Sequence, residues 1–149
     1  MTPFFYKRAA SEIPCDEAEA AYYLGYKKIN PPGDDVAGLI HKSCLKMQPV
    51  LVPQAVYAEY ELSVGEDETV SFADVLFRSK DLARNLRNCR KVVLFAATIG
   101  AQADMIIRRA QISGSADAAV MQGCGAMFIE SFVDLLNDEI RKDTEARKM

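Results

Sequence analysis

An uninterrupted apolar run, Val92–Ala97, constrains the fold of this chain more than any other segment. Its length is that of a β-strand, and it contains no polar residue that would mark a solvent-facing side. Such continuous runs are typical of strands that are covered on both faces. We therefore expect Val92–Ala97 to form a strand that is buried on both faces. The residues Thr98–Gly100 end the run, and helical spacing begins at Ala101.

The segments around this strand have helical signals at both ends of the chain and β-like signals in the middle. Asp16 and Ser79 are placed to cap helices, and Gly25 is placed to end one. The breaker Asn30–Gly33 separates the first two helices. We expect helices at residues 17–25, 34–47, 80–89, 101–112 and 116–142, further strands at 52–62 and 69–72, and an irregular arm at 1–14.

This order of elements lacks the regular strand–helix alternation of a doubly wound fold. It favours an α+β fold, in which a small mixed or antiparallel sheet of two, three or more strands packs with about five helices. A chain of 149 residues has the usual length of one domain, and no linker or repeat divides it. We therefore expect residues 1–149 to form a single domain.

Composition disfavours disorder and nucleic-acid binding. Half of the residues are apolar and the net charge is only −3, so the chain lacks the low hydrophobicity and high charge of a disordered segment. No stripe of Lys and Arg interleaved with aromatic residues is present to neutralise phosphates. The closely spaced basic residues of the tail, Arg141–Met149, are interrupted by Asp143 and Glu145. We expect no nucleic-acid partner.

The sequence also predicts no membrane span and no secretory signal. The longest stretch that is poor in charge, Ala118–Val133, contains a carboxylate and is shorter than the ~20 residues that a spanning helix needs. The N-terminal residues have no apolar core behind a basic start, as a signal peptide would. We therefore expect a cytoplasmic protein.

The four cysteines, Cys15, Cys44, Cys89 and Cys124, are scattered along the chain. In a cytoplasmic protein such residues are usually small buried hydrophobic side chains rather than disulfides or metal ligands. His41 and Cys44 form one H-x-x-C pair, but the second pair that a zinc site requires is missing. We expect no metal site.

The Thr98–Gly100 turn is a candidate ligand-binding element. A turn between a buried strand and a helix exposes backbone N–H groups that can bind an anion. However, the segment has only one glycine, and it lacks both the G-x-G-x-x-G spacing and a P-loop lysine. The structural alternative is that Thr98 caps the helix while Gly100 permits a tight turn.

Glu130 is a second candidate ligand-binding residue, because it carries the only formal charge between Ala118 and Val133. It shares a helix face with small residues, which allow a strand, a helix or a ligand to approach the backbone closely. Its carboxylate can accept hydrogen bonds from a ribose, an amine or a backbone N–H. The structural alternative is an ion pair with Lys80 or Arg108, because an unpaired buried carboxylate costs several kcal/mol. The other face carries the expected core stripe of Val120, Cys124, Phe128, Phe132 and Leu135.

Nothing in the sequence indicates a self-contained catalytic site. His41 is the only histidine, and neither a G-x-S-x-G elbow nor an acid partner accompanies it. We expect no catalytic residue on this chain.

Taken together, several segments resemble the activation domain of cobalamin-dependent methionine synthase, in particular its small free-standing bacterial relatives. The similar segments cover about three quarters of the chain in the family's order and spacing. They are E-A-x-x-Y-L-G-Y at Glu19–Tyr26, P-x-x-x-Y at Pro53–Tyr57, S-K-D-L-x-x-x-L-x-x-C at Ser79–Cys89, K-V-V-L-F-A-A-T-I-G at Lys91–Gly100 and E-S-F-V-D-L-L-N-D-E-I at Glu130–Ile140.

The resemblance implies an α+β domain that binds S-adenosylmethionine beside a corrinoid-binding domain. The family takes part in methionine biosynthesis by reductive methylation. A flavodoxin-like donor supplies an electron to inactive cob(II)alamin, and the methyl group of S-adenosylmethionine restores methylcobalamin. Glu130 matches the family glutamate that lines the nucleoside site. The implied partner is cobalamin-dependent methionine synthase or its corrinoid-binding domain, with cobalamin carried by that partner.

One departure from the family pattern concerns the S-adenosylmethionine site itself. The R-x-x-x-G-Y segment that wraps this ligand in the family does not occur in the sequence. We therefore expect either a fragment or a short relative that lacks this half of the site. Without the R-x-x-x-G-Y segment, apolar surface is also expected to be exposed, and this favours a homodimer. The alternative function is a non-catalytic interaction or scaffold domain that kept the fold and lost the ligand site.

Overall fold

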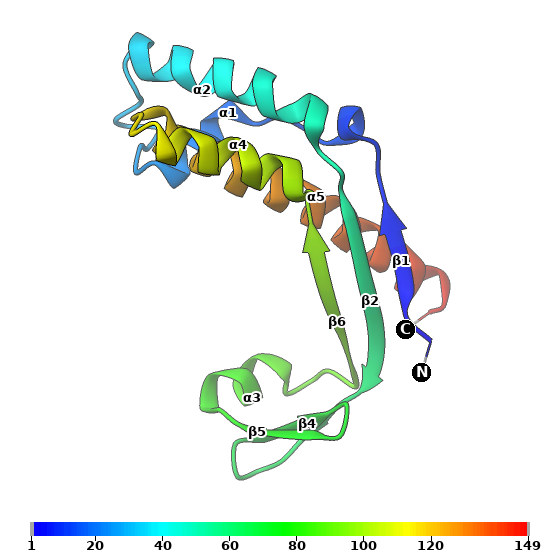
Figure 1. The fold of residues 1–149 in the computed structure, drawn as a ribbon. Helices are drawn as coiled ribbons and strands as arrows, with labels where there is room; N and C mark the ends of the chain where they lie inside the picture. Colours follow the sequence, from blue (N-terminus) through cyan, green and yellow to red (C-terminus); the bar gives the residue numbers. More distant parts are fainter. Residues whose placement is uncertain (1, 149) are drawn as a thin grey trace. The chain divides into compact units, whose positions relative to one another are not determined.

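The computed structural model describes residues 2–148, in which six strands and five α-helices follow one another along the chain (Figure 1). The strands are β1 (Phe4–Lys7), β2 (Gln54–Glu61), β3 (Ser63–Val64), β4 (Thr69–Phe72), β5 (Val75–Arg78) and β6 (Lys91–Thr98). The helices are α1 (Glu17–Tyr23), α2 (Asp34–Met47), α3 (Lys80–Leu86), α4 (Ala101–Ile112) and α5 (Asp117–Ala146), with 3₁₀ turns at Ala10–Glu12 and Gln48–Val50.

Contacts divide the chain into two compact units. The helical unit contains Tyr6–Ala55 and the residues from Ala97 onward, and therefore includes α1, α2, α4 and α5. The sheet unit contains the residues up to Phe5 together with Val56–Ala96, and therefore includes β3, β4, β5 and α3.

The strands form two three-stranded antiparallel sheets, which confirms the expected α+β class. One sheet has the order β1-β2-β6, and Figure 1 shows β2 running against both of its neighbours. The other has the order β3-β4-β5, with Ser63 opposite Ser71 and Thr69 opposite Arg78. The sequence did not predict β1, β3 and β5, which are only two to four residues long.

The helix boundaries follow the expected capping signals. The Asp16 carboxylate accepts a hydrogen bond from the Glu19 N–H at 3.1 Å, and the Ser79 hydroxyl accepts one from the Leu82 N–H at 3.2 Å. Both side chains satisfy N–H groups that have no partner within the helix. Gly25 follows α1 with a φ of 96°, a conformation that glycine adopts without strain.

The core of the helical unit is built around α5, which packs against α1, α2 and α4. The expected core stripe is confirmed at Val120, Cys124, Phe128 and Phe132, which are buried, but it is wrong at Leu135, which is half-buried while its neighbour Leu136 is buried. The Phe132 ring also lies 5.6 Å from the ring of buried Tyr6. Burying each such phenylalanine stabilises the fold by about 1.5–3 kcal/mol, so α5 carries much of the stability of this unit.

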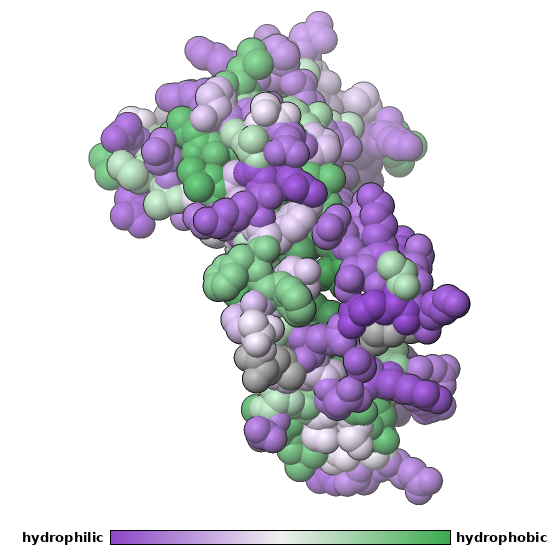
Figure 2. All heavy atoms as spheres, turned by 90° about the vertical axis from the view of Figure 1, so that its right-hand side faces the viewer, coloured by the Kyte–Doolittle hydropathy of each residue, from purple (hydrophilic) through white to green (hydrophobic). Residues whose placement is uncertain are grey.

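The expectation that Val92–Ala97 is buried on both faces is wrong. This run forms β6, but Leu94 is 42% exposed and Phe95 is 50% exposed. The apolar composition of the run indicates a strand, but burial of both faces needs other elements packed on both sides, and the sequence run does not encode that packing; in the sheet, β6 is the edge strand of the order β1-β2-β6. Figure 2 shows apolar residues at the surface among hydrophilic ones on the face that it presents.

The expectation of an irregular N-terminal arm is also wrong for the part of it that the structure describes; residue 1 lies outside. Phe4–Lys7 forms β1, and the Phe4 ring stacks on Tyr57 with 5.3 Å between centroids. In the helical unit, the Arg8 N–H donates to the Pro53 carbonyl at 3.3 Å. The partners of this segment are about fifty residues away in sequence, so its local pattern carries no sign of them.

α5 is the one described helix that is long and apolar enough, by length and composition, to cross a membrane. Half of its most apolar window is buried inside the protein. Its buried residues face α1, α2 and α4, which is the arrangement of a core helix rather than of a helix surrounded by lipid.

Candidate functional site

The turn between β6 and α4 has a conformation that only glycine adopts easily. Gly100 is the N-cap of α4 with φ 99° and ψ 156°. A Cβ atom on Gly100 would lie 3.0 Å from the Cβ of Val52, so neither the backbone nor the available space tolerates a side chain. The Gly100 N–H donates to the Thr98 hydroxyl at 3.0 Å. Thr98 therefore stabilises the turn rather than capping the helix.

This turn forms one wall of a cavity of about 320 Å³ within the helical unit, which we call the junction cavity. Helices α4 and α5 supply the other walls. The lining residues are Ala97, Thr98, Ile99 and Gly100 from the turn, Asp104 and Ile107 from α4, and Gln122, Gly125, Ala126 and Ile129 from α5.

The lining combines an apolar body with a few polar groups, as small-molecule sites usually do. Three isoleucines and the small residues of α5 supply the apolar surface. Asp104 is the only ionisable lining residue, and Gln122 adds an amide that both donates and accepts hydrogen bonds. A single carboxylate without a base or nucleophile beside it can bind and orient a ligand, but it provides no acid–base pair.

Glu130, the third site residue expected from the sequence, does not line the junction cavity. At about 100° per residue, it lies roughly 80° around the axis of α5 from Gln122. Its side chain is exposed, and within the described residues no ion pair joins it to Arg108; Lys80 belongs to the sheet unit. The pKa of nearby Tyr23 is raised, first by burial and then by the charges of Glu130 and other carboxylates. Glu130 therefore lies outside the junction cavity and near Tyr23 of α1.

The small residues of α5 serve two purposes. A Cβ on Gly123 would lie 3.1 Å from the Leu24 side chain and 3.2 Å from the Ala20 carbonyl oxygen, so this glycine lets α1 approach closely. Ala126, one turn before Glu130, lines the junction cavity instead. The sequence left open whether a strand, a helix or a ligand approaches this face of α5. At Gly123 it is a helix, α1.

Sequence reasoning missed Asp104 and Gln122. Asp104 lies in the first turn of α4, four residues after Gly100, where a helix start favours a carboxylate. Gln122 is one of few polar residues between Ala118 and Val133. Both signals were present in the sequence, but only the packing of α4 on α5 shows that the two residues share a cavity.

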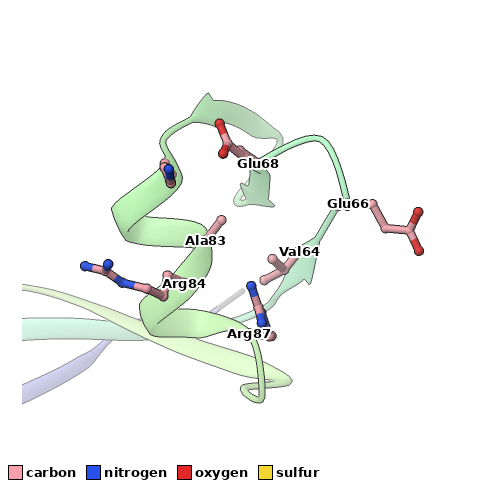
Figure 3. Close-up of a pocket in the computed structure, with 8 residues that line it drawn as sticks. Val64, Glu66, Glu68, Ala83, Arg84 and Arg87 are labelled. Atoms are coloured by element: carbon pink, nitrogen blue, oxygen red, sulfur yellow. The ribbon is translucent and has the colours of Figure 1, made fainter.

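A second hollow, of about 440 Å³, lies within the sheet unit between α3 and the β3–β4 turn (Figure 3). Lys80, Arg84 and Arg87 come from the helix side, and Glu66 and Glu68 come from the turn. Figure 3 shows Arg84 directed away from the turn and Glu66 directed outward. Because these charged groups do not converge on one point, the hollow offers a weaker ligand site than the junction cavity.

The cysteines and the histidine do not form a metal centre. Within residues 2–148, no group of three or more His, Cys, Asp or Glu side chains is arranged to hold a metal ion. His41 of the H-x-x-C pair instead contacts Glu17, with 2.5 Å between Nδ1 and Oε1. Three of the four cysteines nevertheless lie close together, which their spacing in the sequence did not indicate.

Comparisons of the chain with known protein families and with curated proteins find no match.

Proposed function

We propose that this chain is an accessory module for the reductive reactivation of cobalamin-dependent methionine synthase, acting in methionine biosynthesis in the cytoplasm. The proposal begins from the ordered motifs that resemble the activation domain of that enzyme. The single observation that carries it further is that the A-T-I-G motif forms one wall of a ligand-sized cavity, with Glu130 nearby on α5.

The residues of the junction cavity fit part of S-adenosylmethionine. Its apolar walls suit an adenine ring, and Asp104 and Gln122 can hydrogen-bond to a nucleoside. A volume of about 320 Å³ is at the lower end of the range for small-molecule sites, so the cavity holds the nucleoside better than the whole molecule. Glu130 lies outside the cavity on α5, where its carboxylate would contact parts of the ligand that extend beyond the cavity.

The module itself contributes binding and orientation, and its chemistry depends on its partners. When bound, S-adenosylmethionine supplies the methyl group, and the cobalamin of the partner's corrinoid-binding domain receives it. The electron comes from a flavodoxin-like donor. The turn and the two helices would hold the nucleoside, with the isoleucines against its adenine ring.

Calorimetric titration with S-adenosylmethionine tests the ligand half of the proposal. We expect a Kd tighter than about 1 mM for the unchanged chain. Ala126→Leu, which fills the cavity, and Asp104→Asn should each weaken binding about ten-fold or more. Asp138→Asn, an exposed carboxylate elsewhere on α5, is the matched control and should leave the affinity unchanged.

Retention of a corrinoid-binding domain of methionine synthase on the immobilised chain tests the partner half. We expect retention that increases when S-adenosylmethionine is present. A chain that binds neither the ligand nor the corrinoid domain would contradict the proposal as a whole.

The second candidate function is a non-catalytic interaction or scaffold domain. It is favoured by the structural roles of Thr98 and Gly100 and by the exposure of Glu130. It predicts that Glu130→Gln changes neither ligand binding nor the activity of the partner. A loss of S-adenosylmethionine affinity in Glu130→Gln, with the melting temperature unchanged, would contradict it.

A further inference from the structure

Three cysteines that are far apart in sequence meet inside the helical unit. Cys15 precedes α1, Cys44 lies on α2 and Cys124 lies on α5. The Cys44 thiol donates a hydrogen bond to the Cys124 sulfur, with 3.2 Å between the two Sγ atoms. Cys15 lies beside Cys44, because both residues line the same hollow and their interaction raises the pKa of Cys15. Cys44 is therefore the middle member of a row of three thiols.

The row is open to solvent at the Cys15 end only. Cys15 is exposed, whereas Cys44 is 2% exposed and Cys124 is fully buried. Both Cys15 and Cys44 line a hollow of about 670 Å³, which a small reagent can enter. His41 and Glu17 lie at the same hollow.

The backbone beside Cys15 is held in place over α2. The Asp16 N–H lies 3.4 Å from the Met127 sulfur, and the Gln48 side-chain amide donates to the Ile13 carbonyl at 3.0 Å. The first contact joins the residue after Cys15 to α5. The second joins the residue two positions before Cys15 to the 3₁₀ turn that follows α2. These contacts hold the backbone on both sides of Cys15 against the rest of the helical unit.

We propose that Cys15 and Cys44 form an oxidation site, in which a peroxide reacts at Cys15 and the product is an intramolecular Cys15–Cys44 disulfide. This inference does not depend on the proposed function.

The two steps balance without any other reactant. The Cys15 thiolate attacks one oxygen of hydrogen peroxide, the O–O bond breaks, and a sulfenic acid and one water form after proton uptake. The Cys44 sulfur then attacks the Cys15 sulfur, the S–O bond breaks and a second water leaves with the Cys44 proton. One peroxide and two thiols thus give one disulfide and two waters.

The surroundings of Cys15 make the first step slow at neutral pH. Burial of its sulfur, the neighbouring Cys44 and the carboxylates of Glu17 and Asp16 raise the pKa of Cys15 to about 12. Of the other groups that face the hollow, His41 is paired with Glu17. The thiolate, which is the reactive form, is therefore scarce at pH 7 and increases about ten-fold with each pH unit below that pKa. The rate of disulfide formation should rise about 100-fold from pH 7 to pH 9.

We expect Cys124 to take no part in forming the Cys15–Cys44 disulfide. Its thiol donates to the Ile40 carbonyl, with 3.7 Å between sulfur and oxygen, and no solvent reaches it.

The experiment uses the full chain carrying Cys89→Ser, because Cys89 is an exposed thiol in the sheet unit and would add an unrelated reaction. The protein is treated with millimolar hydrogen peroxide between pH 7 and pH 9, quenched in acid and alkylated under denaturing conditions. We expect intact mass spectrometry to show the alkylatable thiols falling from three to one. The three cysteines lie in different tryptic peptides, 9–27, 43–46 and 110–141, so the linked pair is identified directly.

Single substitutions in that background separate the roles. Cys15→Ser, at an exposed position, should slow disulfide formation at least ten-fold, whereas Cys124→Ser should leave the Cys15–Cys44 link intact. Cys44→Ala should stop oxidation at the sulfenic acid or beyond, and its melting curve checks that it folds.

Three results would overturn the proposal. One is the persistence of three thiols at pH 9, and another is overoxidation of Cys15 without any disulfide. The third is an unchanged rate in Cys15→Ser, which would show that the oxidant enters elsewhere.

Discussion

Gly100 is the residue at which backbone conformation and packing restrict the sequence most. Its φ and ψ lie in a region that is essentially restricted to glycine, and Val52 occupies the space that a side chain would need. The Val52 N–H also donates to the Ile99 carbonyl at 2.7 Å, so β6 and the segment before β2 are held together beside the junction cavity. The same residue therefore shapes the turn and fixes the wall behind it.

We predict that Gly100→Ala lowers the free energy of unfolding by about 2–3 kcal/mol, because backbone strain and the contact with Val52 add together. Gly114→Ala is the matched control, since Gly114 also has a positive φ of 68° but has no atom within 4 Å of an added Cβ. Strain alone should cost about 1 kcal/mol there. Urea denaturation of both variants measures the difference, and equal losses would contradict the role given to Val52.

The sequence predicted the site only where its geometry is local. Thr98 and Gly100 are two residues apart, so their turn follows from their order in the chain. Asp104 and Gln122 reach the same cavity only because α4 packs on α5. The approach of Cys44 to Cys124 likewise depends on α2 packing on α5, and no spacing along the chain encodes it.

At the scale of elements, the glycines of the helices differ in what surrounds them. Gly38 of α2 has nothing within 4 Å of an added Cβ, whereas Gly125 of α5 would meet the end of the Ile107 side chain at 3.4 Å. Gly123 would meet Leu24 and the Ala20 carbonyl at 3.1 and 3.2 Å. Because the Ala20 carbonyl belongs to a helix backbone, it cannot move aside as a side-chain end can.

We predict that Gly38→Ala raises the free energy of unfolding by about 0.5–1 kcal/mol, since alanine loses less entropy in a helix. Gly125→Ala should be neutral to slightly stabilising. Gly123→Ala should be destabilising by about 1–3 kcal/mol, because the added methyl group separates α1 from α5. Thermal and urea unfolding give the order, and a stabilising Gly123→Ala would show that α1 does not depend on this close approach.

The helices could be predicted because their signals are local in the sequence. The burial of the strands could not be predicted in this way. Asp16 and Ser79 cap the helices that they were expected to cap, since a cap acts within three residues of itself. β6 was predicted correctly as a strand, but its apolar composition does not show whether other elements cover its two faces. The two-residue strand β3 is too short for any period to be visible.

The exposed apolar residues of β6 lead to a prediction about association. A long apolar edge strand is prone to pair with another chain, so we expect the protein to form a homodimer as its concentration rises. Phe95→Lys places a charge on this strand and should shift sedimentation toward the monomer. Ile112→Lys, at an exposed isoleucine on α4, is the control and should not. Equal sedimentation of all three proteins would contradict association through β6.

At the scale of the whole molecule, the two units differ in how much of their apolar surface is buried. Among the described residues of the sheet unit, Val70 and Ala83 are the only buried hydrophobic side chains. The helical unit contains the remaining buried hydrophobic side chains, including all the large ones other than Val70. Since burial of apolar surface is the main stabilising contribution, the sheet unit has much less stability of its own.

This difference predicts an order of local opening that hydrogen exchange can measure. Amides of α5 around Phe128 and Phe132 should exchange only through global unfolding, and therefore most slowly. Amides of β3, β4, β5 and α3 should exchange through sub-global opening at a lower free energy, although they too are hydrogen-bonded. Substituting Val70 by Ala should accelerate exchange in the sheet unit while leaving α5 unchanged. Uniform protection of both units, or acceleration of α5 by that substitution, would instead show that the chain unfolds as one cooperative body.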